Sequence, residues 1–209
     1  MSKKLFVMKH PLIDHKMAKI RDKDTNSKEF RESVSELGAL LTYEVTRDLE
    51  TNQVEVETPL GKADCQTLSK QVVLVPILRA GLGMVDGIHN IIPTARIGHI
   101  GLYRNEDTLQ PVVYYAKFPK NVKDSLVIVL DPMLATGGTV SKAIDILKER
   151  GVTKIKYVGL VGCPEGVERL QSDHPDVPIY LAALDSHLTD NGYIYPGLGD
   201  CGDRLFGTK

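Results

Sequence analysis

Four short runs of apolar residues constrain the fold of this chain more than any other feature of its sequence. They occupy residues 72–77, 127–130, 157–161 and 179–184, and segments with helical spacing lie between them. Because consecutive positions in these runs are apolar, both faces of each expected strand must be buried. Buried strands that alternate with helices form a parallel sheet, so a doubly wound α/β fold is predicted. Ligands of such sheets bind in the loops at the carboxyl ends of the strands.

The remaining sequence predicts a helix, an exposed strand and an antiparallel hairpin. The helix covers residues 26–49, with an asparagine as its N-cap and apolar residues at helical spacing. Residues 53–58 alternate polar and apolar side chains, which is typical of a strand half exposed to water. Residues 96–102 and 112–117, joined through the polar residues 104–107, are expected to form an antiparallel insertion at one edge of the sheet.

The composition restricts the classes of protein to which the chain can belong. Its 209 residues, 42% of them hydrophobic, suffice for one buried core, so residues 1–209 are expected to form one domain. Acidic and basic residues almost cancel to a formal net charge of −1, which argues against a nucleic-acid partner. Cys65, Cys163 and Cys201 show no disulfide or zinc spacing, and no apolar stretch is long enough to cross a bilayer. A cytoplasmic protein without a membrane partner is expected.

The segment 126–147 predicts a phosphate-binding loop. A buried strand ends at Asp131, a loop of small residues follows, and apolar residues at helical spacing then begin. Within residues 136–139, two glycines let the backbone approach a ligand, two threonines add hydroxyls, and the helix start supplies unpaired N–H groups. The spacing matches neither G-x-x-x-x-G-K-[ST] nor G-x-G-x-x-G. The loop is therefore suited to a phosphate monoester, and an ordinary strand-to-helix turn is the alternative.

The amino-acid sequence of this loop resembles that of a known family. Asp131-Pro-Met-Leu-Ala-Thr-Gly-Gly is similar to the signature for 5-phosphoribosyl 1-pyrophosphate (PRPP) in type I phosphoribosyltransferases, in the variant found in uracil phosphoribosyltransferases. In most of that superfamily an acid stands at the places of Pro132 and Ala135, and its absence at Ala135 argues against a hypoxanthine or guanine enzyme. The resemblance implies that PRPP contacts Asp131, Pro132, Met133, Leu134, Ala135, Thr136, Gly137, Gly138 and Thr139.

Arg79 is a second candidate for binding phosphate oxygens. It follows a buried strand and precedes a glycine-rich bend, where a guanidinium can bind two phosphate oxygens at once. Taken alone, the segment is equally compatible with a compact turn and a solvated arginine. Residues 76–81, Pro-Ile-Leu-Arg-Ala-Gly, are very similar to a segment of uracil phosphoribosyltransferases, which implies that Arg79 contacts PRPP. Residues 101–109 also match that family and imply that Arg104 reaches the pyrophosphate, although the local pattern favours a hairpin tip facing water.

The glycine-rich segment 192–207 is the candidate base-binding site. So many glycines predict an irregular backbone whose N–H and C=O groups can read the edge of a flat base, and a loop that merely caps the sheet is the alternative. The segment resembles Pro-Gly-Leu-Gly-Asp-Ala-Gly-Asp of uracil phosphoribosyltransferases, with Cys201 in place of the alanine. The side chain of Cys201 would affect the choice of 5-substituted uracils only if it lined the pocket. The resemblance implies uracil binding by Ile194, Gly199, Asp200 and Cys201, and a contact of Asp200 with PRPP.

The resemblance extends over essentially the whole chain and implies a complete reaction. A uracil phosphoribosyltransferase transfers the 5-phosphoribosyl group of PRPP to N1 of uracil, beneath a C-terminal hood over the base, and releases UMP and pyrophosphate. Mg²⁺ is expected to arrive on PRPP, with no direct metal ligand from the protein. A homodimer or larger homo-oligomer and a GTP effector are also implied. The implied catalytic residues are Arg79, Arg104, Asp131 and Asp200.

Two rival functions share this fold. A regulator that binds RNA would carry two adjacent acids before the phosphate loop and a basic stripe, and Asp131-Pro132 departs from that pattern. A sensor that binds nucleoside monophosphates without turnover would need damaged PRPP contacts. The tripeptide 185–187, Asp-Ser-His, contains the residue types of a hydrolase triad, but neighbours in sequence seldom converge on one site.

Overall fold

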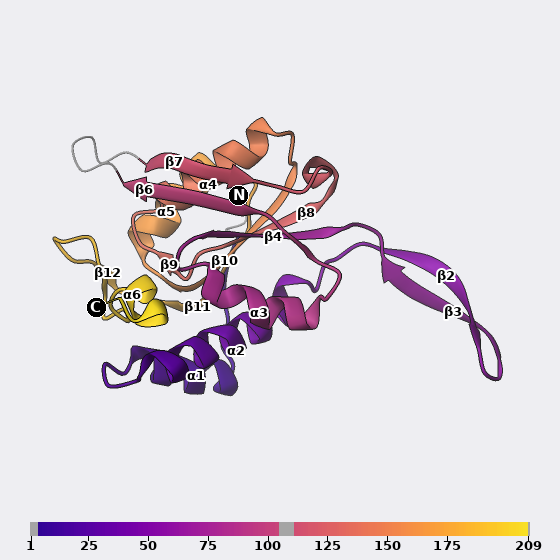
Figure 1. Ribbon diagram of the computed structural model, residues 1–209, viewed down its shortest axis with the longest axis horizontal. Helices are drawn as coiled ribbons and strands as arrows, with labels where there is room; N and C mark the ends of the chain where they lie inside the picture. The colour runs from indigo at the N-terminus through magenta and orange to yellow at the C-terminus, as the bar shows by residue number, and fades with distance from the viewer. Residues whose placement is uncertain (1–3, 105–110, 209) are drawn as a thin grey trace.

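The computed structural model describes residues 4–104 and 111–208, and it is centred on a nine-stranded sheet (Figure 1). The order of its main path is β1-β11-β10-β8-β4-β6-β7, with β5 beside β4 and β9 beside β10. All pairs are parallel except β6 with β7, so the predicted α/β class with an antiparallel edge is confirmed. The strands are β1 Leu5–Val7, β4 Val72–Leu78, β5 Arg96–Ile97, β6 His99–Arg104, β7 Pro111–Lys117, β8 Leu126–Leu130, β9 Met133–Leu134, β10 Lys154–Gly162 and β11 Ile179–Leu184.

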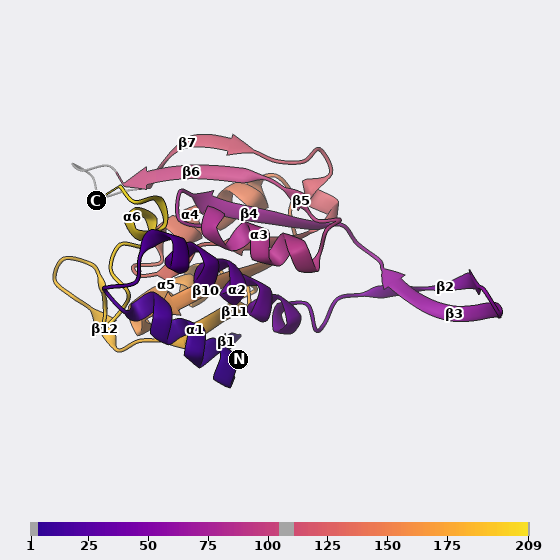
Figure 2. The ribbon, with the colours of Figure 1, turned by 60° about the horizontal axis from the view of Figure 1, so that its bottom comes forward.

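Helices cover both faces of this sheet, as the doubly wound prediction requires (Figures 1 and 2). Alternate residues of β4 and β8 point to opposite faces, so that Leu74 and Ile128 belong to one core cluster and Val73 and Val127 to the other. One cluster contains residues of α1 (Pro11–Arg21), α2 (Ser27–Val45), α3 (Leu82–Ile91) and α6 (Cys201–Phe206). The other contains residues of α4 (Gly138–Glu149) and α5 (Pro164–Asp173), and the short 3₁₀ helix η1 spans Val122–Asp124.

Helix α2 begins where the sequence predicts and ends earlier than predicted. The Asn26 side chain accepts a hydrogen bond of 3.0 Å from the Glu29 N–H, and Glu29 in turn accepts one of 2.9 Å from the Asn26 amide. The helix stops at Val45 rather than near Leu49. A helix that the sequence analysis did not predict, α1, precedes it and starts with a proline in its first turn.

The strand predicted at 53–58 is one half of a two-stranded hairpin that projects from the body (Figures 1 and 2). It spans Thr51–Thr58 as β2 and pairs antiparallel with β3, Gly61–Leu68, in full register. Nearly every residue of this pair is exposed, including Leu60 at the tip. We call β2, β3 and their turn the arm.

The C-terminal segment folds against the carboxyl end of α1. Strands β12 (His187–Leu188) and β13 (Ile194–Tyr195) pair antiparallel, and α6 follows. Arg204 donates to the Ile20 carbonyl at 2.5 Å and to the Leu198 carbonyl at 2.7 Å. Arg21 forms an ion pair of 2.6 Å with Asp185. These two arginines join segments that lie more than 160 positions apart in sequence.

Candidate active site

The strand order brings two of the predicted site segments together at the carboxyl edge of the sheet. Strands β4 and β8 are neighbours, and the chain continues from β4 towards β6 on one side and from β8 towards β10 on the other. Such a reversal opens a crevice at the carboxyl ends of the two strands. Arg79 follows β4 and Asp131 follows β8. The bend after Arg79 is packed closely, since a Cβ on Gly81 would lie 2.4 Å from the Leu130 carbonyl oxygen.

Arg79 reaches from this crevice to the C-terminal helix. One of its guanidinium nitrogens lies 3.2 Å from Oδ1 of Asp203, and the guanidinium carbon lies 5.7 Å from the centre of the Phe206 ring. The peptide bond between Leu78 and Arg79 is cis. The Arg79 side chain remains 55% exposed, so it can bind phosphate oxygens without leaving a buried position.

The predicted phosphate loop is a strand, turn and helix start, as expected. Gly137 is the N-cap of α4 and has a φ of +75°, a left-handed conformation that favours glycine. Thr136 is exposed and Thr139 partly buried, whereas the side chains of Pro132 and Leu134 are buried. Pro132 and Leu134 can therefore offer a ligand mainly their backbones. The first N–H groups of α4 supply the anion-binding end of a 12-residue helix.

The start of helix α5 packs against the backbone of this loop. The Cys163 thiol lies 3.2 Å from the Ala135 carbonyl oxygen, and the Cys163 N–H donates to the Leu134 carbonyl at 3.3 Å. A Cβ on Gly166 would lie 2.3 Å from the Ala135 carbonyl oxygen, and one on Gly137 would lie 2.8 Å from the Gly166 carbonyl oxygen. The loop and α5 thus approach each other as closely as glycine allows. This support was not predicted, because nothing local to residues 163–166 marks it.

Asp131 directly follows β8, and burial desolvates its carboxyl. Although the residue is partly accessible, burial raises the pKa of its carboxyl to about 7, and a long hydrogen bond of 3.4 Å from the Met133 N–H opposes that shift. The fully buried Tyr157, on β10, donates its hydroxyl to the Asp131 carbonyl oxygen at 2.7 Å. Burial, and then the charge of Asp131, raises the pKa of the Tyr157 phenol. Tyr157 was predicted only as part of an apolar strand.

The predicted uracil-binding residues adjoin this crevice through the N-terminus of α6. Asp200 is the N-cap of α6 and accepts a hydrogen bond of 2.9 Å from the Asp203 N–H. Burial raises the pKa of the Cys201 thiol, and the charges of Asp131 and Asp200 add to that shift. A Cβ on Gly202 would lie 3.3 Å from Oδ1 of Asp200 and 3.7 Å from a guanidinium nitrogen of Arg79, so these two side chains are neighbours. Cys201 and Ile194 are buried in the core, which directs their side chains away from solvent. Gly199 has a φ of +79°.

Arg104 is the remaining predicted catalytic residue. Its backbone ends β6, at the same edge of the sheet as Arg79 and Asp131. Its side chain and the adjoining residues 105–110 lie outside the described residues. Its predicted contact with pyrophosphate stays a prediction.

The triad-like tripeptide does not assemble a hydrolase site. Ser186 and His187 are 2.8 Å apart between Oγ and Nδ1. The Asp185 carboxylate is instead held by Arg21 and by the Gly197 N–H at 2.8 Å. The acid is thus committed to an ion pair away from the histidine, and the arrangement lacks the acid–histidine contact of a triad.

The described part of the chain holds neither a metal-binding cluster nor a membrane-spanning helix. Across residues 4–104 and 111–208, no group of three or more His, Cys, Asp or Glu side chains is arranged to hold a metal ion. None of the helices in those ranges is long and apolar enough to cross a membrane.

Known proteins resemble this chain over nearly its whole length. The family model "Uracil phosphoribosyltransferase" matches residues 7–208. Proteins of that name from Acholeplasma laidlawii and Bacillus cytotoxicus are 68% and 58% identical to the chain, each over 99% of both sequences. A solved structure of an Aquifex aeolicus protein superimposes with a TM-score of 0.93 at 39% identity, over 98% of this chain and 99% of that one. An adenine phosphoribosyltransferase from Trypanosoma brucei, at 13% identity and a TM-score of 0.60, shares the fold, over 91% of this chain and 87% of that one.

Proposed function

The chain belongs to the uracil phosphoribosyltransferase family, and we propose that it performs the family's reaction in the crevice between β4, β8 and α6. The reaction transfers the 5-phosphoribosyl group from PRPP to N1 of uracil and yields UMP and pyrophosphate. The observation that carries the site is the approach of Arg79, at the end of β4, to the start of α6: it lies 3.2 Å from Asp203, and a Cβ on Gly202 would lie within 4 Å of both Arg79 and Asp200. Residues 1–209 are proposed to act as one domain.

The loop from Asp131 to Thr139 is proposed to bind the 5-phosphate of PRPP. Its glycine N-cap and the first N–H groups of α4 favour a doubly charged group, and the hydroxyls of Thr136 and Thr139 add hydrogen bonds. The 5-phosphate lies away from the bond between C1 and the pyrophosphate oxygen, which breaks in the reaction. Binding energy from this remote group can therefore hold the ribose in the orientation needed for reaction.

Arg79 and Arg104 are proposed to bind the pyrophosphate as it leaves. Weakening of the bond between C1 and oxygen places negative charge on the leaving group and positive charge on the ribose, so guanidinium groups stabilise the transition state more than the ground state. Asp131 and Asp200 are proposed to face the ribose and the metal. Mg²⁺ bound to PRPP supplies further neutralisation of the pyrophosphate.

The base is proposed to bind to the backbone of residues 194–201. Uracil offers an acceptor, a donor and an acceptor at O2, N3 and O4, and cytosine reverses the last two, so a backbone fitted to uracil leaves unpaired groups against cytosine. The burial of Ile194 and Cys201 supports recognition by main-chain groups rather than by these side chains. On this basis Cys201 is expected to leave the choice among 5-substituted uracils unchanged.

The oligomeric state, the cellular location and an effector of the enzyme are part of the same proposal. The projecting arm, with its exposed Val56 and Leu60, supports a homodimer or larger assembly, since a second copy would cover these side chains. The free thiols of Cys65, Cys163 and Cys201 support a cytoplasmic location. GTP is proposed as an effector from the family resemblance, to be checked by assays with and without GTP.

Steady-state assays with PRPP and Mg²⁺ test the function directly. Uracil, cytosine, hypoxanthine and orotate are supplied in turn, and turnover is expected with uracil alone. The Asp200→Asn variant is expected to lose most of that activity, since it removes a charge from the crevice while keeping a side chain able to cap α6. Absence of turnover with every base would contradict the enzyme and favour the sensor or the regulator that binds RNA.

A further inference from the structure

A partly buried polar network joins the end of helix α5 to the first turn of α4, just after the proposed phosphate loop. Ser141 lies in that turn and is 5% exposed, and His174, which directly follows α5, is 3% exposed. Burying a polar side chain costs free energy unless it finds a hydrogen-bond partner. Ser141 and His174 find such partners in each other and in the side chains of Asp173 and Lys148.

Ser141 connects the phosphate loop to α5. Its N–H donates to the Gly137 carbonyl at 2.9 Å, which closes the first turn of α4 on its N-cap. Its hydroxyl donates to Oδ2 of Asp173, on α5, at 2.7 Å. The N–H groups of residues 138–140 come before this first hydrogen bond of the helix and are the groups available to a phosphate. The contact with Asp173 therefore acts on the turn that carries these N–H groups.

His174 adds a second contact to the same turn. The ammonium of Lys148 lies 3.1 Å from Nδ1 of His174 and can only donate, so Nδ1 is the acceptor nitrogen of the ring. The ring hydrogen is then on Nε2, which donates to the Ser141 carbonyl oxygen at 3.1 Å. The Asp145 carboxylate, 3.5 Å from Nε2, faces the same hydrogen. The buried ring thus links the last turn of α4 to its first.

Arg169 holds the Asp173 carboxylate in place. Its Nε donates to Oδ2 of Asp173 at 2.6 Å, the same oxygen that accepts from Ser141. The hydrogen bond from Arg169, and then that from Ser141, lower the pKa of Asp173, so this side chain is a carboxylate at neutral pH. A Cβ on Gly137 would lie 3.1 Å from both Cβ and Cγ of Arg169, so the stem of Arg169 lies against the N-cap of α4.

We propose that Ser141 and Asp173 are positioning residues, which hold the first turn of α4 in the orientation that binds the 5-phosphate of PRPP. This inference rests on the proposed function of the phosphate loop. A carboxylate near the anion-binding end of a helix repels a phosphate, so electrostatics alone would disfavour Asp173 at this place. Its two hydrogen bonds on one oxygen give it a geometric role instead, because hydrogen bonds to the phosphate weaken steeply when the N–H groups are misaligned.

Binding of ribose 5-phosphate to the full chain, measured by calorimetry, tests this role without requiring the reaction. Ser141→Ala removes the hydroxyl and Asp173→Ala removes its acceptor, so each should weaken binding by about fivefold to tenfold. Asp173→Asn keeps an oxygen that can accept from Ser141 and should retain most of the affinity. Ser125→Ala is the matched control, since Ser125 is 4% exposed and donates to the Asn121 carbonyl at 2.9 Å, just before the amino end of β8. It should leave the affinity unchanged.

The sign of the effect in Asp173→Ala distinguishes positioning from charge. This substitution removes a negative charge near the phosphate and leaves Arg169 without its carboxylate partner, so a purely electrostatic role predicts tighter binding. Positioning predicts weaker binding. Tighter or unchanged binding in Asp173→Ala, unchanged binding in Ser141→Ala, or an equal loss in Ser125→Ala would overturn the proposal.

Steady-state kinetics separate this role from a general loss of structure. In Ser141→Ala, KM for PRPP should rise by the same factor as the Kd of ribose 5-phosphate, while KM for uracil stays unchanged, because the base is proposed to bind to residues 194–201. An equal rise in both KM values would contradict a role confined to the phosphate loop. Absence of turnover in the natural protein would count against the proposed reaction, whereas ribose 5-phosphate would still report on Ser141 and Asp173. A natural protein that did not bind ribose 5-phosphate would overturn the positioning role together with the phosphate loop.

Discussion

The two edges of the central sheet differ in how completely their charged side chains are paired with others of the same chain. At the amino edge, ammonium groups meet carboxylates of the same chain, as in the pairs of Lys154 with Glu50 and Lys156 with Asp48. At the carboxyl edge, burial raises the pKa of Asp131 to about 7, and Arg79, although it contacts Asp203 at 3.2 Å and the Phe206 ring, keeps 55% of its side chain exposed. The charged groups at the carboxyl edge are thus only partly neutralised within the chain. This is expected of a site where a charged substrate supplies the remaining partners.

The largest expected effect is the loss of the proposed contact between Arg79 and the leaving pyrophosphate. Arg79→Gln should lower kcat/KM for PRPP by about 10³-fold, or ~4 kcal/mol, because a guanidinium contact that strengthens in the transition state is lost. Unfolding free energy should change by less than about 0.5 kcal/mol, since the contact is exposed. Arg47→Gln, which removes an exposed arginine paired with Glu44, is the matched control and should leave kcat/KM unchanged. Equal losses in both variants would contradict a role for Arg79 in the site.

A second effect concerns the close approach of the phosphate loop to α5. Gly137→Ala should cost about 2–4 kcal/mol of unfolding free energy, because the new Cβ meets the Gly166 carbonyl in a left-handed backbone. Gly151→Ala should cost only about 1 kcal/mol, since φ is +81° there but the nearest atom is 3.7 Å away. Urea denaturation measures both. Similar losses would show that backbone conformation, rather than packing on α5, decides the requirement for glycine.

A smaller effect is expected from loss of the Tyr157 hydroxyl, which supports the backbone at Asp131. Tyr157→Phe removes only the hydroxyl that donates to the Asp131 carbonyl and should cost about 1–3 kcal/mol of unfolding free energy. It should also raise KM for PRPP severalfold, because the strand end that carries Asp131 loses its support. Tyr180→Phe makes the same change on the neighbouring strand β11 and should leave KM unchanged. A normal KM in Tyr157→Phe would limit this tyrosine to a role in stability.

The smallest expected effect is a dependence of stability on pH. The folded pKa of Asp131 is about 7, above its ordinary value of 3.8, so the folded protein binds a proton that the unfolded chain releases between these values. Unfolding free energy should therefore fall as pH rises from about 4 to 7, by roughly 1–2 kcal/mol for this partly accessible group. Asp131→Asn should lack this fall and be more stable than the natural protein at pH 8, though inactive. Parallel stability curves for the two proteins would contradict a raised pKa.

Local sequence determined the elements from which the candidate active site is built. The apolar runs predicted β4, β8, β10 and β11, because strands buried on both faces require apolar side chains at consecutive positions. The phosphate loop and the start of α2 were also predicted, since a left-handed glycine and an N-cap act within a few residues of themselves. The resemblance to the uracil phosphoribosyltransferases then supplied the family.

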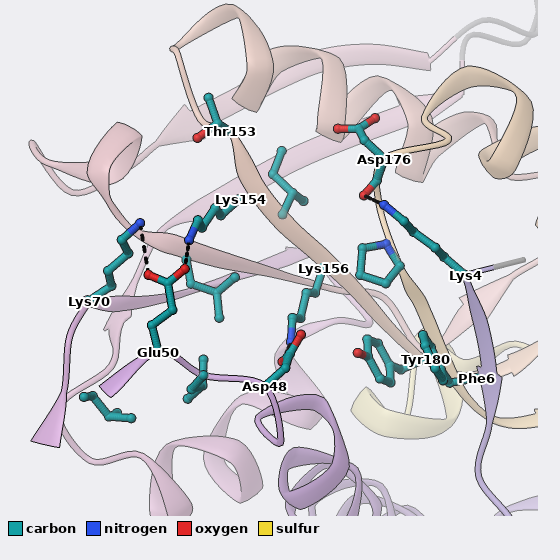
Figure 3. Close-up of a pocket in the computed structure, with 15 residues that line it drawn as sticks. Lys4, Phe6, Asp48, Glu50, Lys70, Thr153, Lys154, Lys156, Asp176 and Tyr180 are labelled. Atoms are coloured by element: carbon teal, nitrogen blue, oxygen red, sulfur yellow. Dashed lines mark hydrogen bonds and ion pairs between the residues drawn. The ribbon is translucent and has the colours of Figure 1, made fainter. Parts of the chain in front are cut away.

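Only the tertiary structure decided which of these elements meet. The contacts of Tyr157 with Asp131, of Arg79 with Asp203 and of Cys163 with Ala135 depend on strand order and register, which local patterns do not specify. The arm was half missed because the side chains that alternate with polar ones in β3 are the small Ala63 and Cys65, a weak strand signal, and the strand remains largely exposed. A cavity at the amino ends of the core strands joins residues from six separate segments, which no local pattern could have placed together (Figure 3).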